Sequence, residues 1–144
     1  MEGKKEIIVL GVLFVSIFIL GVYLYSNLID YLSIIEKKEI YAQINVGDHY
    51  GINVNKSALT FGTVRPGGFS TRNVTITNSY DYAIRIKIYA KGSIKDFITT
   101  PENDFILYVN QTKNIGFVVT PPSGTPAGNY EGKVVVITTN PVVK

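Results

Sequence analysis

The sequence predicts a mainly β protein: an immunoglobulin-like antiparallel β-sandwich of about seven strands, preceded by one long N-terminal transmembrane-type α-helix. Two observations lead to this fold class. Residues 7–25 are nineteen residues without a charge, whereas residues 52–144 hold short runs of alternating apolar and polar side chains between turn signals. We therefore expect a hydrophobic helix and amphipathic stalk over 1–41, a linker over 42–51, and the sandwich over 52–144.

The apolar run from Ile7 to Tyr25 is long enough to cross a bilayer. At about 1.5 Å per residue it reaches roughly 28 Å, close to the thickness of the hydrocarbon core. A buried core helix and a cleaved signal peptide are the alternatives. A domain of this size could hardly enclose a helix that is apolar on every face, and bulky residues stand where a cleavage site needs small ones. We expect membrane lipid to be the partner of residues 7–25.

The charges on either side of this run predict its orientation. Lys4 and Lys5 come directly before it, and the next cations, Lys37 and Lys38, are a dozen residues beyond its end. The positive-inside rule then places the N-terminus in the cytoplasm and the rest of the chain outside the cell.

A helical pattern continues after the apolar run. Leu28, Leu32 and Ile35 recur at the spacing of one helix face. We expect the helix to extend to about Tyr41, with these three residues forming a helix-association face that another element or copy would cover. The segment "NVGDHYG" then breaks the helix, because it contains two glycines, Asn and Asp.

Everything beyond this linker has strand character. Strands are expected at 52–54, 58–61, 72–77, 84–90, 105–109, 113–120 and 129–138. The glycine-rich bend in "LTFGTVRPGGFSTRN" is interpreted as a turn, because a phosphate-binding loop needs a helix after it and a strand follows here. Pro66 presets its own φ, and Gly67 or Gly68 supplies the positive φ that reverses the chain.

Residues for catalysis are scarce. The chain has no cysteine, which excludes thiol catalysis and thiolate metal sites, and its single histidine, His49, stands beside Asp48 in the expected linker. A calcium site or a plain polar loop would both fit the acidic cluster, and the loop is favoured because the spacing matches no calcium-binding loop. This cluster comprises Asp96, Glu102, Asn103 and Asp104. We expect no catalytic residue, no metal, no cofactor and no small-molecule substrate.

Two surface features remain as candidate sites. Three sequons for N-glycosylation begin at Asn55, Asn73 and Asn110, all in the part expected outside the cell. Arg85 and Lys87 form a short basic contact stripe opposite the apolar face of their strand, which is either solvated or meets an acidic surface. Residues 42–144 carry only four more cations than anions, too weak an excess to indicate nucleic acid.

The order of motifs resembles known surface modules. "LTFGTVRPGGFSTRNVTITNSYDYAIRIKIY" is similar to the first half of PapD-like and ASH-type immunoglobulin modules, and "FVVTPPSGTPAGNYEGKVVV" is similar to the closing strands of Ig-like domains of archaeal surface proteins. This likeness covers roughly residues 52–138. It implies a module that binds, spaces or assembles, and it brings no catalytic residue. The membrane anchor departs from the ASH-type modules, so their partners do not carry over.

The whole chain resembles, in outline, the type IV pilin-like subunits of archaea, including archaellins and archaellum stator proteins. Those proteins also continue a hydrophobic N-terminal helix into an external β-sandwich. "MEGKKEIIVLG" has a basic leader and Glu6 but no cleavage site at the spacing that pilins use. Two functions are therefore expected: a membrane-anchored extracellular structural or interaction protein that contacts other surface proteins or copies of itself, or a filament subunit whose helix packs in the filament core.

Overall fold

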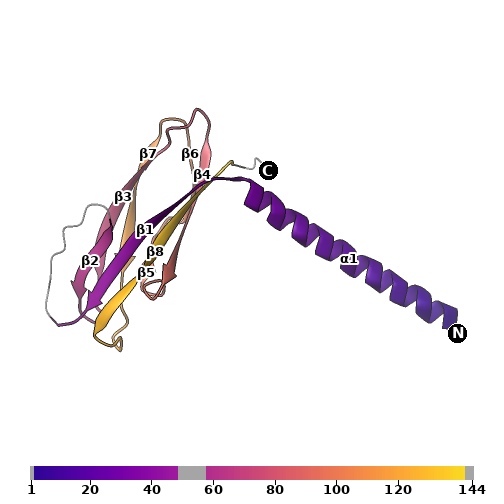
Figure 1. The fold of residues 1–144 in the computed structure, drawn as a ribbon, viewed down its shortest axis with the longest axis horizontal. Helices are drawn as coiled ribbons and strands as arrows, with labels where there is room; N and C mark the ends of the chain where they lie inside the picture. Colours follow the sequence, from indigo (N-terminus) through magenta and orange to yellow (C-terminus); the bar gives the residue numbers. More distant parts are fainter. Residues whose placement is uncertain (1, 49–57, 142–144) are drawn as a thin grey trace. The chain divides into compact units, whose positions relative to one another are not determined.

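The computed structural model describes residues 2–48 and 58–141, which contain one helix and eight strands (Figure 1). The chain divides into two compact units, Met1–Ile34 and Ile35–Lys144. The elements are α1 (Glu2–Leu32), β1 (Ile34–Val46), β2 (Leu59–Val64), β3 (Ser70–Thr77), β4 (Ile84–Gly92), β5 (Ile98–Thr99), β6 (Asp104–Leu107), β7 (Thr112–Val119) and β8 (Gly128–Thr139). The expected fold class, mainly β with one long apolar helix, is confirmed.

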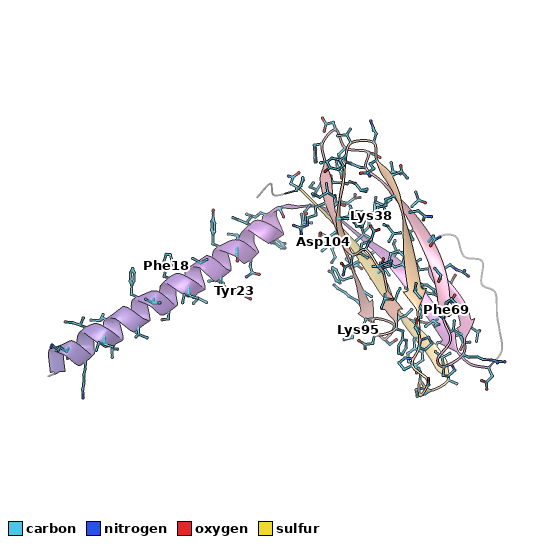
Figure 2. The ribbon with its side chains drawn as sticks, turned by 180° about the vertical axis from the view of Figure 1, so that it is seen from behind. Phe18, Tyr23, Lys38, Phe69, Lys95 and Asp104 are labelled. Atoms are coloured by element: carbon cyan, nitrogen blue, oxygen red, sulfur yellow. The ribbon has the colours of Figure 1, made fainter. Side chains whose placement is uncertain are left out.

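Helix α1 is apolar around its whole circumference. The stretch Gly3–Ile29 has the length and composition of a membrane span, and no part of its most apolar window is buried within the protein. Its few polar side chains bond back to the helix, as when the Ser16 hydroxyl donates to the carbonyl of Leu13 at 2.8 Å. Figure 2 shows Phe18 and Tyr23 projecting from this helix. Among the described residues, none buries the most apolar window of α1.

The second unit consists of two sheets. One sheet has the strand order β2-β1-β8-β4-β6, and the other has the order β3-β7-β5. The pairs β3–β7, β4–β6, β4–β8 and β5–β7 are antiparallel. β1 and β2 run parallel, with Ala42 opposite Leu59, so this pair departs from the expected antiparallel arrangement.

The hydrophobic core lies between the facing sides of the two sheets. β4 alternates as its sequence predicts: Ile84, Ile86 and Ile88 are buried, and the residues between them face outward. Phe117 on β7, 2% exposed, meets this layer from the other sheet. Burying such a side chain stabilises the fold by about 1.5–3 kcal/mol, so the two alternating faces account for why the sheets pack together.

The expected extension of the helix to Tyr41 is wrong, and residues 42–46 of the linker expected over 42–51 belong to a strand. Residues 49–51 lie outside the described residues. The helix ends at Leu32, and residues Ile34–Val46 form β1. The reason is burial at every second position: Ala42, Ile44 and Val46 are at most 1% exposed. Burial of every second residue is the pattern of a β-strand, and here the strand lies between β2 and β8. This packing outweighs the helical spacing of the residues before it.

The glycine-rich bend is the expected turn. The backbone N–H of Gly68 donates to the carbonyl of Arg65 at 2.9 Å, and Gly67 has φ +78°. Pro66 and Gly67 thus occupy the central positions of a type II turn, and β3 follows at once. Of the expected strands, 52–54 lies outside the described residues; the very short β5 and the strand β1 were not expected.

Candidate functional site

The basic stripe on β4 is partly neutralised. The Arg85 guanidinium donates to both carboxylate oxygens of Asp104 on β6, at 2.6 and 2.7 Å. This hydrogen-bonded pair lowers the pKa of Asp104 below its usual range. Lys87 lies directly opposite Asp104 in the β4–β6 register and adds a smaller attraction. The main partner of the Arg85 guanidinium in the sheet is therefore the carboxylate of Asp104 on the neighbouring strand.

The stripe continues along β4 beyond the two predicted residues. The ammonium of Lys91 lies 5.4 Å from the centre of the exposed Tyr89 ring. Opposite Tyr89, on the same outer face, Val135 of β8 is completely buried by its neighbours. The outer face of the five-stranded sheet therefore carries lysines next to a buried apolar side chain.

Acids and bases alternate on the outer side of β1 and β8. Glu39 receives a hydrogen bond from Lys133 at 2.7 Å and pairs with Lys37 at 3.3 Å, and these contacts, with Lys133 the stronger, lower the pKa of Glu39. A hydrogen bond to Glu131 raises the pKa of Tyr41. The side chains named here are therefore engaged with one another on this face.

The acidic cluster does not converge on one point. Glu102 pairs with Lys113, and Asp104 pairs with Arg85. Asn103 takes part through its backbone carbonyl, which accepts a hydrogen bond from the N–H of Ile88 at 2.8 Å. Among residues 2–48 and 58–141, no three His, Asp or Glu side chains lie close enough to share a metal ion. His49 lies outside the described residues.

The three residues of the expected helix-association face belong to two different elements. Leu28 and Leu32 lie on α1 and are exposed, but Ile35 belongs to β1 and packs against the sandwich core. The spacing that joined the three residues is interrupted because the helix ends at Leu32.

Two of the three sequons can be located. Asn73 is exposed on β3, and its opposite residue on β7 is Gly116, so no side chain stands across from it. Asn110 is exposed in the turn between β6 and β7, with φ +59°. Asn55 lies outside the described residues.

One lateral edge of the sandwich is closed by side chains. The Arg72 side chain on β3 donates to the backbone carbonyl of Thr60 on β2 at 2.9 Å, and the Ser70 hydroxyl donates to the carbonyl of Phe61 at 2.9 Å. β2 and β3 are terminal strands of different sheets. These bonds occupy carbonyls that an added strand would need, which disfavours strand addition at this edge.

Two clefts open between the sheets. One, of about 180 Å³, lies between β1 and β3, with the charged pair Glu36 and Lys38 beside apolar residues such as Ile76 and Ile84. The other, of about 260 Å³, is lined by Ile88, Ile98 and Phe117, with Thr99, Thr100 and Asn103 among its polar residues. In the first cleft, the Glu36 carboxylate is engaged by Lys38 at 3.1 Å.

Sequence reasoning missed a buried polar residue whose side chain makes four hydrogen bonds. Asn78, just after β3, is fully buried, and its amide donates to the carbonyls of Tyr82, Leu107 and Tyr108 at 2.8, 3.1 and 3.1 Å. Its own side-chain oxygen accepts from the N–H of Tyr80 at 3.0 Å. The signal was the "TNSY" segment, because Asn often bonds to the backbone two residues on.

No protein-family model matches the chain. No curated protein and no solved structure matches it either.

Proposed function

We propose that this protein is a membrane-anchored, non-enzymatic structural or interaction protein. Helix α1 spans the lipid, and the sandwich acts outside the cell as a subunit or accessory of a surface assembly. The observation that carries this proposal is the apolar stretch Gly3–Ile29, whose most apolar window is not buried by any of the described residues. A surface of that size requires lipid or other helices around it.

The dimensions of the helix support a lipid span. At about 1.5 Å per residue, Gly3–Ile29 is roughly 40 Å long, enough for the hydrocarbon core and part of both headgroup layers. Tyr23 and Tyr25 lie toward its C-terminal end, where tyrosine suits the interface between lipid and water.

The charges around the helix support a cytoplasmic N-terminus. Lys4 and Lys5 lie in its first turns. Lys37 and Lys38, on the other side, pair with Glu39 and Glu36. The cationic bias therefore lies before the span, which favours an extracellular sandwich.

The sandwich is suited to contact rather than to catalysis. Its carboxylates at Glu39, Glu102 and Asp104 are engaged with cations. Its outer sheet face carries Tyr89 along β4, flanked by Lys87 and Lys91, and tyrosine is a residue enriched in protein interfaces. Other surface proteins, or copies of this chain, are the proposed partners, as in the surface modules that the sequence resembles.

A filament subunit is the second candidate. The same exposed apolar helix favours it, because helices without a polar face also pack together in the core of a filament. Mechanical shearing of intact cells separates the two: recovery in sheared filaments supports the filament subunit, and retention in the membrane supports the anchor.

The proposed membrane anchor is tested by introducing one charged residue into the apolar helix of the full chain. Phe18→Arg places a cation near the middle of the span, which costs about 2.5–3.5 kcal/mol on insertion scales. We expect the native chain to stay in the membrane through alkaline extraction and its sandwich to be cut by protease added outside cells. Phe18→Arg should be extracted, and the matched Phe18→Leu variant should not. A native chain that alkali extracts, or a sandwich that external protease spares, contradicts the proposal.

A further inference from the structure

The exposed apolar side chains of the sandwich gather at one end. From residue 35 onward, the described residues include seven large apolar side chains with substantial exposure. Four of them form what we call the end patch: Tyr82, Ile106, Tyr108 and Val109, which are 40, 46, 66 and 46% exposed. Clustering of this kind marks a surface that meets an apolar partner.

The end patch lies at the end of the sandwich where β1 begins. Glu36, near the start of β1, lines one cleft together with Tyr80 and Ile84. Ile84 is the register partner of Leu107, which directly precedes Tyr108. Figure 2 shows Lys38 and Asp104 toward this end of the sandwich and Phe69 toward the other.

The patch is rigidly built. The buried Asn78 amide holds the carbonyls of Tyr82 and Tyr108, so a single side chain ties together the two loops that carry the patch. The turn itself is closed twice: Gln111 N–H donates to the Tyr108 carbonyl at 3.0 Å, and Tyr108 N–H donates to the Gln111 side-chain oxygen at 2.9 Å. The exposed side chains of Tyr108 and Val109 are therefore carried by a turn whose backbone is already held in place.

The chain itself brings this end to the membrane. Only Ser33 separates the last residue of α1 from the first residue of β1. A span that leaves the lipid near Ile29 therefore delivers the start of β1 to the interface between lipid and water.

We propose that the end patch docks on the lipid surface, with Tyr108 and Val109 inserted among the headgroups. This inference rests on the proposed membrane anchor. Tyrosine is enriched at this depth of a bilayer, and an aliphatic neighbour adds buried apolar area. The docked sandwich is then held at the membrane by two contacts, the span and the patch.

The charges near the patch favour zwitterionic lipid. Arg85 is paired with Asp104, and Lys113 is paired with Glu102, while Asp81 is exposed in the loop that carries Tyr82. Attraction to an anionic headgroup is weakened here, because these two cations are already paired and Lys87 lies opposite the carboxylate of Asp104. The expected docking is hydrophobic and therefore insensitive to salt.

The test uses the absence of tryptophan from the chain. Three single-tryptophan variants of the full chain, Phe18→Trp, Tyr108→Trp and Phe69→Trp, are reconstituted in phosphatidylcholine vesicles. Some vesicles contain lipid with a nitroxide quencher at the top of the acyl chain, and others contain lipid with a quencher at its end. Phe69, 75% exposed in the turn before β3, is the matched control at the opposite end of the sandwich.

We expect the deep quencher to suppress emission from Phe18→Trp, which reports insertion of the helix. The shallow quencher should suppress emission from Tyr108→Trp, whose spectrum should shift to shorter wavelength and stay unchanged in molar salt. Phe69→Trp should emit as in water and remain unquenched. Adding Val109→Asp to Tyr108→Trp should abolish the shallow quenching, because a carboxylate resists transfer out of water.

The failures are distinguishable. If Phe18→Trp is quenched but Tyr108→Trp is quenched no more than Phe69→Trp, the docking inference is overturned and the anchor stands. If Tyr108→Trp shifts to shorter wavelength without lipid quenching, the patch contacts another protein copy and the inference is also overturned. If no variant is quenched, the chain is not in the lipid, and both the anchor and the docking inference fail.

Discussion

The side-chain amide of Asn78 donates a hydrogen bond to the backbone carbonyl of Tyr108 at 3.1 Å, although the two residues are 30 positions apart. The same amide reaches the carbonyls of Tyr82 and Leu107. The bond to Leu107 is buried and the bonds to Tyr82 and Tyr108 are partly buried, which limits the access of water to these carbonyls. One polar side chain thus joins the end of β3, the loop before β4 and the turn after β6.

Replacing this amide should destabilise the sandwich strongly. Asn78→Ala removes the donor to three carbonyls and is expected to lower the free energy of unfolding by about 3 kcal/mol. Asn78→Asp should be worse at neutral pH, because its carboxylate cannot donate and would lie buried against carbonyl oxygens. Urea unfolding of the full chain in detergent, followed by circular dichroism, measures both.

The control is Asn114→Ala, at an exposed asparagine on β7, which should change stability by less than about 0.5 kcal/mol. Equal losses for Asn78→Ala and Asn114→Ala would mean that the buried amide does not hold the loops together.

β4 and β8 approach each other too closely for side chains at one position. Gly92 and Gly132 are register partners, and a Cβ added at Gly132 would overlap the carbonyl oxygen of Lys91. Gly132→Ala should therefore cost at least about 2 kcal/mol, since backbone would have to move. Gly124→Ala, where a Cβ meets open space, should change stability by less than about 0.5 kcal/mol. Thermal unfolding of the two variants compares their stability directly. Similar unfolding midpoints would show that β4 and β8 can move apart here at little cost in free energy.

The sequence predicts the strands well where one face is buried and the other is exposed. β4 follows the expected alternation because its isoleucines all enter the same core. β1 was missed because its first half contains Glu, Lys and Ile at spacings that also suit a helix. Only the partners β2 and β8, which come later in the chain, supply the burial that selects the strand.

The candidate surface was predicted only in part. The outward direction of Arg85 followed from alternation, but its pairing with Asp104 depends on the β4–β6 register, which no local pattern contains. Likewise, the exposed Tyr108 and Val109 were expected inside a strand, because apolar residues usually continue one. The strand ends at Leu107, where Ile84 is its register partner.

The Arg85–Asp104 pair predicts a defined sensitivity to acid. The pKa of Asp104 in the folded state lies below its ordinary value of 3.8, so the pair contributes stability above that pH. The contribution is lost as the pH falls from there through the lowered pKa. Asp104→Asn should reduce stability at pH 7 by less than about 1 kcal/mol, because the pair is largely exposed, and should flatten this part of the acid profile.

Chemical unfolding of the full chain across the acid range measures the profile. Asp96→Asn serves as the control, because Asp96 is exposed and takes part in none of the ion pairs found among the described residues. If the stability of Asp104→Asn changes with acid in the same way as that of the native chain, the pair is not a source of the pH dependence.

The two described sequons are expected to differ in use. Asn73 stands on the open face of β3 opposite Gly116, which leaves room for a glycan. Asn110 shares its turn with Tyr108 and Val109, so a hydrophilic glycan there would compete with docking of the end patch on lipid. In a host that N-glycosylates external proteins, Asn73→Gln should remove one glycan from the intact mass, and Asn110→Gln should leave the mass of the glycans unchanged.

Thr75→Ala supplies the matched control, because it destroys the same sequon while keeping Asn73 itself. It should lose the same glycan as Asn73→Gln. If the glycan is instead lost with Asn110→Gln, the turn between β6 and β7 must be open to the glycosylating enzyme, and a sugar at its tip would keep Tyr108 and Val109 away from the headgroups. The glycan pattern thus tests the orientation of the span and the docking of the patch at once, because an unglycosylated sandwich in such a host argues against external exposure.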